Sequence, residues 1–309
     1  MGASVLKSPS SAPVEIQLKH DPHLAVISHG WASLAPLHRK DDYSLLWSVV
    51  LPDAGPSCVN VSWKGQHSRV RASLRSRRSI SSVDRTFLRA ALRWMFRADE
   101  SFADFWNACK KSPLKVSCEA RAGALLRSAS VFEDVVKTIC TTNCHWRNTK
   151  RMVSGLCVSL GRKCDLGEGE VGFSFPNCYD LSSARMSKLK DIGLGYRAEY
   201  LKEFACNVKS GKCDLGNIAE IQESNMLRER LLEIKGVGSY AAHHIMMLLG
   251  HYDFIPCDSE VAAYLGLPTR TPLRKVERTA AARYGHWGCF AFLAYKLDRV
   301  LSNKNYVDC

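Results

Sequence analysis

Residues 232–260, LEIKGVGSYAAHHIMMLLGHYDFIPCDSE, contain a glycine pair and, near their end, an aspartate. Gly236 and Gly238 lie between an apolar cluster and a second helical segment. A helix, a short glycine turn and a second helix expose backbone amides at a helix N-terminus, and such amides bind phosphate. Lys235 adds a positive charge beside the turn. The pattern predicts a phosphate-binding turn, although glycines at this spacing also end ordinary helices.

The aspartate, Asp258, follows Ile-Pro-Cys and precedes the helical segment SEVAAYLG. One interpretation is an N-cap, whose carboxylate accepts hydrogen bonds from the first helical amides. The other interpretation uses the same geometry, because a carboxylate that accepts such bonds stays ionised. An ionised carboxylate can stabilise a cationic sugar while a glycosidic bond breaks. The residue types leave both interpretations open.

The elements that must position these groups follow from hydrophobic spacing. Residues 14–75 hold Val-, Leu- and Trp-rich runs broken by Pro and Gly, which predict strands and turns. Beyond residue 83 the apolar residues recur at three- and four-residue steps, which predicts helices. Ser130 with Glu133 indicates a helix start, and Gly161 indicates a helix end.

These patterns predict an α+β fold in two parts. After a flexible tail (1–13), we expect a mixed domain of antiparallel strands and helices (14–125). We expect a larger, all-helical domain to follow (126–309). The N-terminal tail MGASVLKSPSSAP lacks the apolar core of a signal peptide.

Composition indicates the class of partner. The chain of 309 residues carries 43 Lys and Arg against 30 Asp and Glu, a net charge of +13. This surplus suits a polyanion, nucleic acid before an anionic membrane. The arginines between Arg69 and Arg78 fit either a solvated strand or a phosphate-facing edge. No apolar run approaches the roughly 20 residues of a membrane span.

Thirteen cysteines, an odd number without any Cys-x-x-Cys pair, indicate reduced thiols rather than a disulfide scaffold or a zinc or iron–sulfur site. We therefore expect an intracellular, reducing compartment.

The segment LLEIKGVGSYAAHHIMMLLG…FIPCD resembles the helix-hairpin-helix/Gly-Pro-Asp (HhH-GPD) signature of a DNA glycosylase superfamily. Its members include endonuclease III, the adenine glycosylases, 8-oxoguanine glycosylase and bacterial 3-methyladenine glycosylase II. The resemblance implies that Asp258 is catalytic. It also implies that the hairpin grips the DNA backbone through Lys235, Gly236, Val237, Gly238 and Ser239. A monovalent cation is implied on the hairpin carbonyls of Leu232, Ile234 and Val237, with no side-chain metal ligand.

Two further segments resemble 8-oxoguanine glycosylase. SVFEDVVKTICTTN ends where that enzyme has Ser-Ser-Asn, and LKDIGLGYRAEYL is similar to its Gly-Leu-Gly-Tyr-Arg-Ala segment. The resemblance implies that Asn143 fills the gap left by an extruded base and that Tyr196 is an aromatic wedge beside the lesion. Taken alone, Asn143 fits a helix-terminal polar residue better, and Tyr196 fits a packed turn tyrosine better. The resemblance covers about residues 125–295, and the strand-rich part agrees in character only.

The chain departs from the family at one catalytic position. Members that also cleave the strand carry a lysine four residues after the first hairpin glycine, where this chain has Tyr240. Without that amine no Schiff base can form there, so we expect a monofunctional enzyme in which water replaces the base. Tyr240 is then expected to stack in the base pocket.

The substrate pocket departs as well. The positions that match the oxidised-guanine pocket are His244, Leu248 and Glu260, in place of Cys, Met and His. Glu260 fits either a bond to a base or sugar edge or stabilisation of the first helical turn. Alkylated purines are the expected substrate, because a cationic base stacks well on an aromatic ring.

The family's four-cysteine iron–sulfur loop is missing after Asp258, which predicts the cluster-free branch and no cofactor. The resemblance implies base excision repair on damaged double-stranded DNA, without a membrane, by a monomer. A nuclear location is expected if the source is eukaryotic. Two alternatives stay open: a non-catalytic damaged-DNA-binding protein, and a bifunctional lyase that uses another amine such as Lys235.

Overall fold

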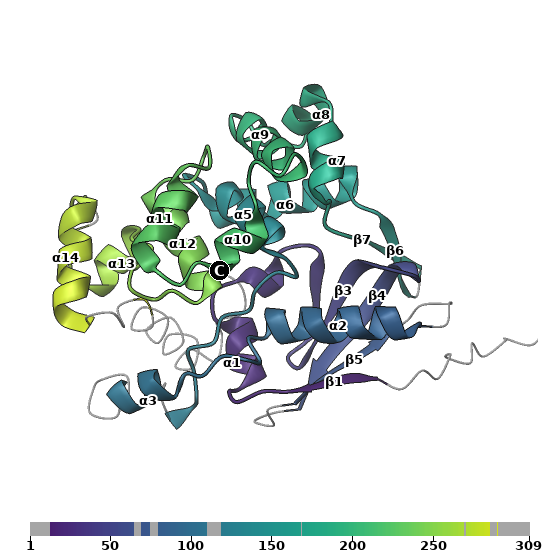
Figure 1. Cartoon of the computed structure of the whole chain (residues 1–309), viewed down its shortest axis with the longest axis horizontal. Helices are drawn as coiled ribbons and strands as arrows, with labels where there is room; N and C mark the ends of the chain where they lie inside the picture. The colour runs from purple at the N-terminus through teal and green to yellow at the C-terminus, as the bar shows by residue number, and fades with distance from the viewer. Residues whose placement is uncertain are drawn as a thin grey trace, which may run out of the picture.

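The computed structural model describes residues 13–64, 69–74, 80–109, 119–167, 169–268, 270–284 and 289. An antiparallel sheet lies to one side with helix α2 across it, and most of the later helices gather beside it (Figure 1). The sheet order is β1-β5-β4-β3-β2. Its strands are β1 (Val14–Gln17), β2 (Leu37–Asp41), β3 (Ser44–Leu51), β4 (Gly55–Trp63) and β5 (Arg69–Leu74).

The sheet forms because its strands alternate apolar and polar side chains. In β5, Val70 and Ala72 are buried while Arg69 and Arg71 point outward. A strand with this period presents one apolar face, and α2 (Ser82–Met95) covers that face in a shared core. Two short helical segments precede β2: α1 (Pro22–Ile27) and the 3₁₀ turn η1 (Trp31–Ser33).

The predicted arginine segment is partly described. Arg71 and Arg69 form ion pairs with Glu15 on the neighbouring strand β1, at 2.6 and 3.8 Å. Arg75, Arg77 and Arg78 lie outside the described residues. The described arginines therefore have a carboxylate partner within the sheet.

The remaining helices confirm the predicted local signals. Ser130 caps its helix by accepting the Glu133 amide at 3.2 Å, and Gly161 follows the last residue of α6. The helices are α3 (Ala103–Cys109), α5 (Val131–Thr141), α6 (Trp146–Leu160), α7 (Cys178–Ser183), α8 (Met186–Asp191), α9 (Arg197–Lys209), α10 (Leu215–Glu220), α11 (Ser224–Leu232), α12 (Ser239–Leu249), α13 (Ser259–Tyr264) and α14 (Leu273–Tyr284). In the described ranges, none is long and apolar enough to cross a membrane.

The α+β prediction is confirmed, but the second part is not purely helical. It contains a hairpin of β6 (Lys163–Gly167) and β7 (Glu170–Phe173). Cys164 and Leu166 alternate along β6, and Leu166 packs with Leu46 and Cys58 of the first sheet. Since these partners come from the N-terminal part, the segment gains more by pairing as strands than by continuing as a helix.

Two large cores share the chain, one between the sheet and α2 and one around α5, α9 and α12. Trp31 and Leu34 belong to the helical core although they come from the N-terminal part, and Leu126 belongs to the sheet core. The two parts therefore pack against each other, and the boundary at residue 125 stays a prediction.

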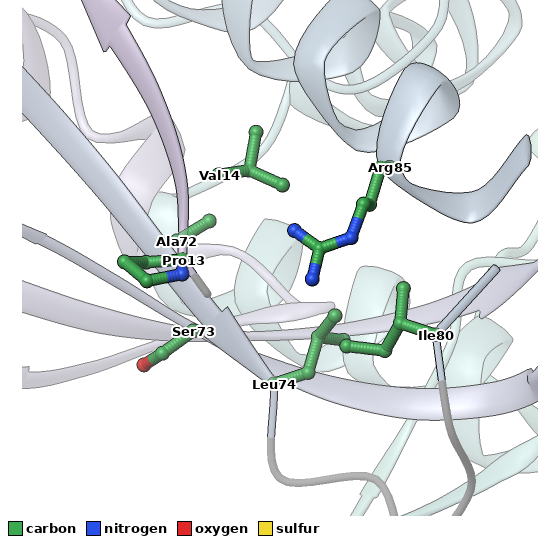
Figure 2. Close-up of a pocket in the computed structure, with 7 residues that line it drawn as sticks. All are labelled: Pro13, Val14, Ala72, Ser73, Leu74, Ile80 and Arg85. Atoms are coloured by element: carbon green, nitrogen blue, oxygen red, sulfur yellow. The ribbon is translucent and has the colours of Figure 1, made fainter. Parts of the chain in front are cut away.

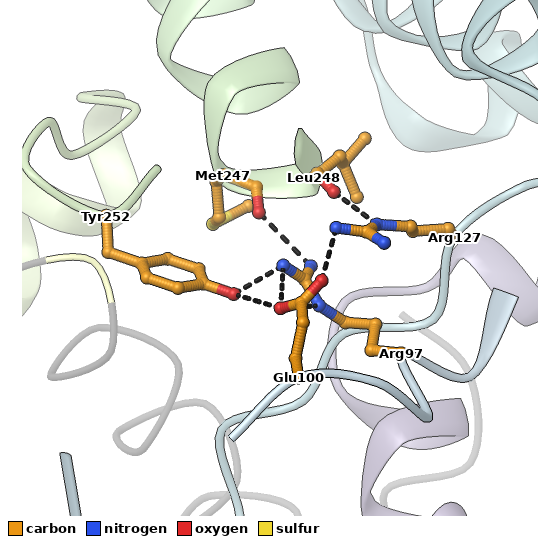
Figure 3. Close-up of polar contacts among 6 residues, drawn as sticks. All are labelled: Arg97, Glu100, Arg127, Met247, Leu248 and Tyr252. Atoms are coloured by element: carbon orange, nitrogen blue, oxygen red, sulfur yellow. Dashed lines mark hydrogen bonds and ion pairs between the residues drawn. The ribbon is translucent and has the colours of Figure 1, made fainter. Parts of the chain in front are cut away.

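A buried ionic network joins the two parts (Figure 3). Arg97 and Arg127 donate to the backbone carbonyls of Met247 and Leu248, at the C-terminal end of α12. Glu100 accepts from both guanidinium groups, at 2.8 Å from Arg97 and 2.5 Å from Arg127. Cations suit the last carbonyls of a helix, so this network fastens α12 to the segment after α2.

Candidate active site

The predicted glycine turn joins α11 to α12. Gly236 has φ +90°, and a Cβ there would lie 2.6 Å from the ring of Tyr200, so only glycine fits. Gly238 is the N-cap of α12, makes no side-chain capping bond, and has no atom within 4 Å of a would-be Cβ. The first amides of a helix have no intrahelical partner. The N-terminus of α12, at Ser239, is therefore open to an anion such as phosphate.

Lys235 lies beside this turn but faces another helix. Its ammonium is 2.8 Å from a carboxylate oxygen of Glu203 on α9, and both side chains are about half exposed. The bond to Glu203 raises the pKa of Lys235, so the amine stays protonated. Val237, two residues on, is buried in the helical core.

Asp258 is the N-cap of α13, as one of its two interpretations predicts. Its Oδ1 accepts the amides of Glu260 and Val261, each at 2.9 Å. Two amide donors on one carboxylate favour its ionised form. The capping geometry thus supplies a fixed negative charge, which is what the second interpretation requires.

Tyr240 connects the turn with Asp258. Burial raises the pKa of its phenol, and the negative charges of Asp258 and Glu260 raise that pKa further. A hydrogen bond with Thr141 lowers the pKa by a smaller amount. These influences place the phenol near the C-terminal end of α5 and near the first residues of α13. A neutral aromatic ring therefore stands next to the carboxylate.

An aromatic layer extends from Tyr240 into the N-terminal part. His244, one turn along α12, meets the Tyr240 ring edge-on at 6.0 Å and stacks on Trp31 at 4.9 Å. His29 also stacks on Trp31, at 4.8 Å. The two imidazole centroids are 6.0 Å apart, too close for opposite faces of one indole, so both lie on the same face. Trp31 in turn donates its indole N–H to the Asp134 carboxylate at 2.8 Å.

Sequence reasoning missed His29 and Trp31. The only sequence feature that could have indicated them is the pair of aromatic residues on either side of Gly30, and such pairs are common in loops. Gly30 has φ +88°, and a Cβ there would lie 2.9 Å from the ring of Trp146. The loop therefore packs closely against Trp146 of α6. This packing positions Trp31 of the loop against His244 of α12.

Asn143 and Tyr196, the two residues predicted to hold an opened base stack, lie on linked segments. Asn143 is exposed with φ +48°, in the loop between α5 and α6. Tyr196 is 50% exposed immediately before α9. The buried Arg197 stacks its guanidinium on the Tyr196 ring at 4.6 Å and donates to the Thr142 carbonyl. Arg197, which sequence reasoning missed, thus couples the two segments.

The structure does not bring Leu248 to this group. It is 1% exposed, in the helical core two turns along α12 from Tyr240. A small pocket is seen elsewhere, between the β1–β5 edge and the start of α2 (Figure 2), and it contains none of the predicted site residues. The residues that line it are Pro13, Val14, Ala72, Ser73, Leu74, Ile80 and Arg85.

The side chains offer little to a metal ion. Across the described ranges, no three His, Cys, Asp or Glu side chains gather as a metal site. The Ile234 carbonyl accepts the Val237 amide at 2.9 Å. Backbone carbonyls are the oxygen donors that hard cations take, and the monovalent cation on Leu232, Ile234 and Val237 stays a prediction.

No family model matches the chain. The N-glycosylase/DNA lyase of Saccharomyces cerevisiae is 28% identical over 190 residues, which cover 57% of this chain and 50% of that protein. The probable N-glycosylase/DNA lyase of Methanothermobacter thermautotrophicus is 23% identical over 190 residues, covering 55% of this chain and 60% of its own length. The chain thus spans about half the length of the curated relatives it matches.

Solved structures of DNA glycosylases have the same fold over nearly the whole length of this chain. The 3-methyladenine DNA glycosylase from Archaeoglobus fulgidus covers 93% of this chain and 99% of its own, at a TM-score of 0.72 and 19% identity. The 8-oxoguanine glycosylase/lyase of Clostridium acetobutylicum, in complex with double-stranded DNA, covers 90% of this chain and 92% of its own, at a TM-score of 0.68 and 19% identity. The chain therefore has the fold of these DNA glycosylases, and its glycine hairpin and capping aspartate lie where the resemblance to the helix-hairpin-helix/Gly-Pro-Asp superfamily places them.

Proposed function

We propose that this protein is a monofunctional DNA glycosylase, which flips a damaged base out of duplex DNA and hydrolyses its N-glycosidic bond in base excision repair. The observation that carries the proposal is the amide-bonded carboxylate of Asp258, which lies with Tyr240 near a glycine hairpin whose first helical amides have no side-chain cap. The names of the relatives, N-glycosylase/DNA lyase and 3-methyladenine DNA glycosylase, support the same class of reaction.

The geometry suggests which residues bind the DNA, which hold the flipped base and which assist hydrolysis. The amides after Gly238 bind a backbone phosphate, while Tyr196 and Asn143 occupy the opened stack. The extruded base then enters beside Tyr240 and His244. As the bond from C1′ to the base lengthens, Asp258 stabilises the positive charge on the sugar and orients a water. The base departs with the bonding electron pair, the water oxygen bonds to C1′, and the Asp258 carboxylate accepts the proton that the water releases.

Water rather than an amine is the proposed nucleophile, because neither Tyr240 nor Lys235 offers a free amine to the sugar. Tyr240 occupies the place of the family's lysine, and a phenol of raised pKa forms no Schiff base. The amine of Lys235 is paired with Glu203 on the side of α9. The word lyase in the relatives' names keeps strand cleavage as the second candidate function.

Alkylated purines are the proposed substrates. Such bases carry a positive charge, which stacks favourably on electron-rich rings and is lost when the base departs. The partly exposed ring of Tyr240 offers such a face. The buried His244 and Trp31 extend the aromatic layer behind it, and the Trp31 indole N–H is bonded to the Asp134 carboxylate. A damaged base is also easier to flip, which adds selectivity.

We further propose that the enzyme acts on damaged double-stranded DNA as a monomer, without an iron–sulfur cluster. We place it in the nucleus of a eukaryotic cell or in another reducing compartment. The free thiols of the described cysteines support the reducing environment.

The test is an assay of duplex oligonucleotides that carry alkylated, deaminated or oxidised bases. The control is Asp258→Asn, since asparagine still caps a helix but lacks the charge. We expect strand breaks only after alkali, and a loss of about 10²–10³ in rate in the variant. Breaks before alkali, with a borohydride-trapped adduct, would establish the lyase. Tight lesion binding without release of any base would establish a damaged-DNA-binding protein.

A further inference from the structure

The loop that carries Asp258 (Gly250–Asp258) is tied to α11 at its beginning. The Ser224 hydroxyl, on the first residue of α11, donates to the Asp253 carboxylate at 2.5 Å and lies 2.9 Å from Nδ1 of His251. The other ring nitrogen of His251 lies 3.0 Å from the Ile221 carbonyl. Tyr252 joins the same loop to Glu100 of the N-terminal part, at 2.9 Å. The first half of the loop is thus held from two directions.

The half of the loop nearest Asp258 is held by one buried histidine of α12, His243. Its Nδ1 lies 3.1 Å from the carbonyl oxygen of Ile255, and its Nε2 lies 3.1 Å from Nε of Arg228 on α11. A carbonyl only accepts and a guanidinium only donates. Nδ1 must therefore carry the hydrogen and Nε2 must be bare, so the contacts specify one neutral tautomer.

The surroundings of His243 suit this neutral form. The side chain is 2% exposed and stacks on Phe254 at 5.0 Å. Burial lowers the pKa of His243, the bond to the Ile255 carbonyl and the carboxylate of Glu277 on α14 raise it, and the charge of Arg228 lowers it. The ring therefore connects α11, α12 and the catalytic loop in a single fixed orientation.

We propose that His243 is a positioning residue for Asp258, and that its Nδ1–H bond to the Ile255 carbonyl sets the distance between the carboxylate and the hairpin. The inference rests on the proposed glycosylase function. His243 lies five residues after the N-cap Gly238, and Ile255 lies three residues before Asp258. The bond is therefore a short bridge from the phosphate-binding turn to the catalytic charge. A displacement of about 1 Å at a reacting centre can cost about 10²-fold in rate.

Two substitutions separate this role from a general contribution to stability. His243→Asn keeps an N–H donor at the position of Nδ1, whereas His243→Gln keeps an acceptor near Nε2 and loses the bond to Ile255. We expect the Asn variant to stay within about threefold of the wild-type single-turnover rate, and the Gln variant to fall by about 10²-fold. Both should bind the lesion duplex with wild-type affinity, because the hairpin amides are unchanged. Equal losses of rate in the two variants, tracking their melting temperatures, would overturn the proposal.

A second measurement keeps this test independent of the enzyme's activity. Hydrogen exchange of the Glu260 and Val261 amides reports directly on the cap made by Asp258. We expect faster exchange in His243→Gln and wild-type exchange in His243→Asn. If the wild-type protein releases no base while exchange still separates the variants, the glycosylase proposal fails and the positioning role stands. If the wild type releases base but the Gln variant matches it in rate and exchange, only the positioning role fails.

Discussion

The phenol of Tyr240 bonds with Thr141 of α5 and lies within the influence of the Asp258 carboxylate. Burial and that neighbouring charge raise its pKa, so the ring is neutral and its hydroxyl keeps its proton. A side chain in this state can stack and hydrogen-bond but cannot act as a nucleophile. The buried His244 connects this ring to Trp31 in the helical core. The residue types at this scale favour recognition of a planar base over covalent chemistry.

This assignment predicts different outcomes for two substitutions of Tyr240. Tyr240→Ala removes the stacking ring, and base–aromatic stacking contributes about 1–3 kcal/mol. We therefore expect kcat/KM for an alkylated duplex to fall by about tenfold or more, while Tyr240→Phe keeps most of the activity. The measurement is steady-state base release, with affinity for undamaged duplex as the control. An equal loss in both variants would assign the role to the hydroxyl and its bond with Thr141.

At the scale of the elements, the helix hairpin uses its two glycines differently. Gly236 has a positive φ and no room for a side chain beside Tyr200, whereas Gly238 has an ordinary φ of −91° and open space around it. The first glycine is therefore required for the fold of the turn. The second leaves the N-terminus of α12 accessible.

We expect alanine substitutions to separate these two functions. Gly236→Ala should lower the free energy of unfolding by about 2 kcal/mol or more, since it adds both strain and a clash. Gly238→Ala should leave stability within about 0.5 kcal/mol but weaken DNA binding, because its methyl group would stand at the open amides. Thermal melting and binding to a labelled duplex measure the two effects. Wild-type DNA affinity in Gly238→Ala would rule out the hairpin as the phosphate site.

Across the whole molecule, a buried network holds the sheet part and the helical part together. Arg97 and Arg127 share Glu100 and bind the C-terminal end of α12 (Figure 3). Tyr240 lies at the other end of that helix. His20 lies beside this network. Burial and the charge of Arg97 lower its pKa to about 4, so it stays neutral in the folded protein at pH values where an unfolded chain would protonate it.

The stability of the whole molecule should therefore fall in acid. Between pH 7 and pH 4 the unfolded chain binds a proton at His20 that the folded protein does not, which lowers the free energy of unfolding by about 3 kcal/mol. His20→Asn should remove that part of the pH dependence. Denaturant unfolding of both proteins at a series of pH values measures the difference. Parallel losses of stability in the wild type and the variant would contradict the role of His20.

Features that depend on residues close together in the chain could be predicted from the sequence. The cap of Ser130 on Glu133, the end of α6 at Gly161 and the cap made by Asp258 all involve bonds within four residues. Such bonds form wherever the local pattern occurs, so composition and spacing predict them. The residues of the hairpin motif are also contiguous along the chain, which is why the amino-acid sequence is sufficient to indicate the resemblance.

Tertiary structure alone decided which distant side chains meet. Packing of the N-terminal loop against α12 brings Trp31 to His244, and packing of α9 beside the hairpin pairs the Lys235 amine with Glu203. The β6–β7 hairpin forms because its apolar residues find partners in the first sheet. In each case the partner lies far away in the chain. Its identity depends on how whole elements pack, which no local spacing encodes.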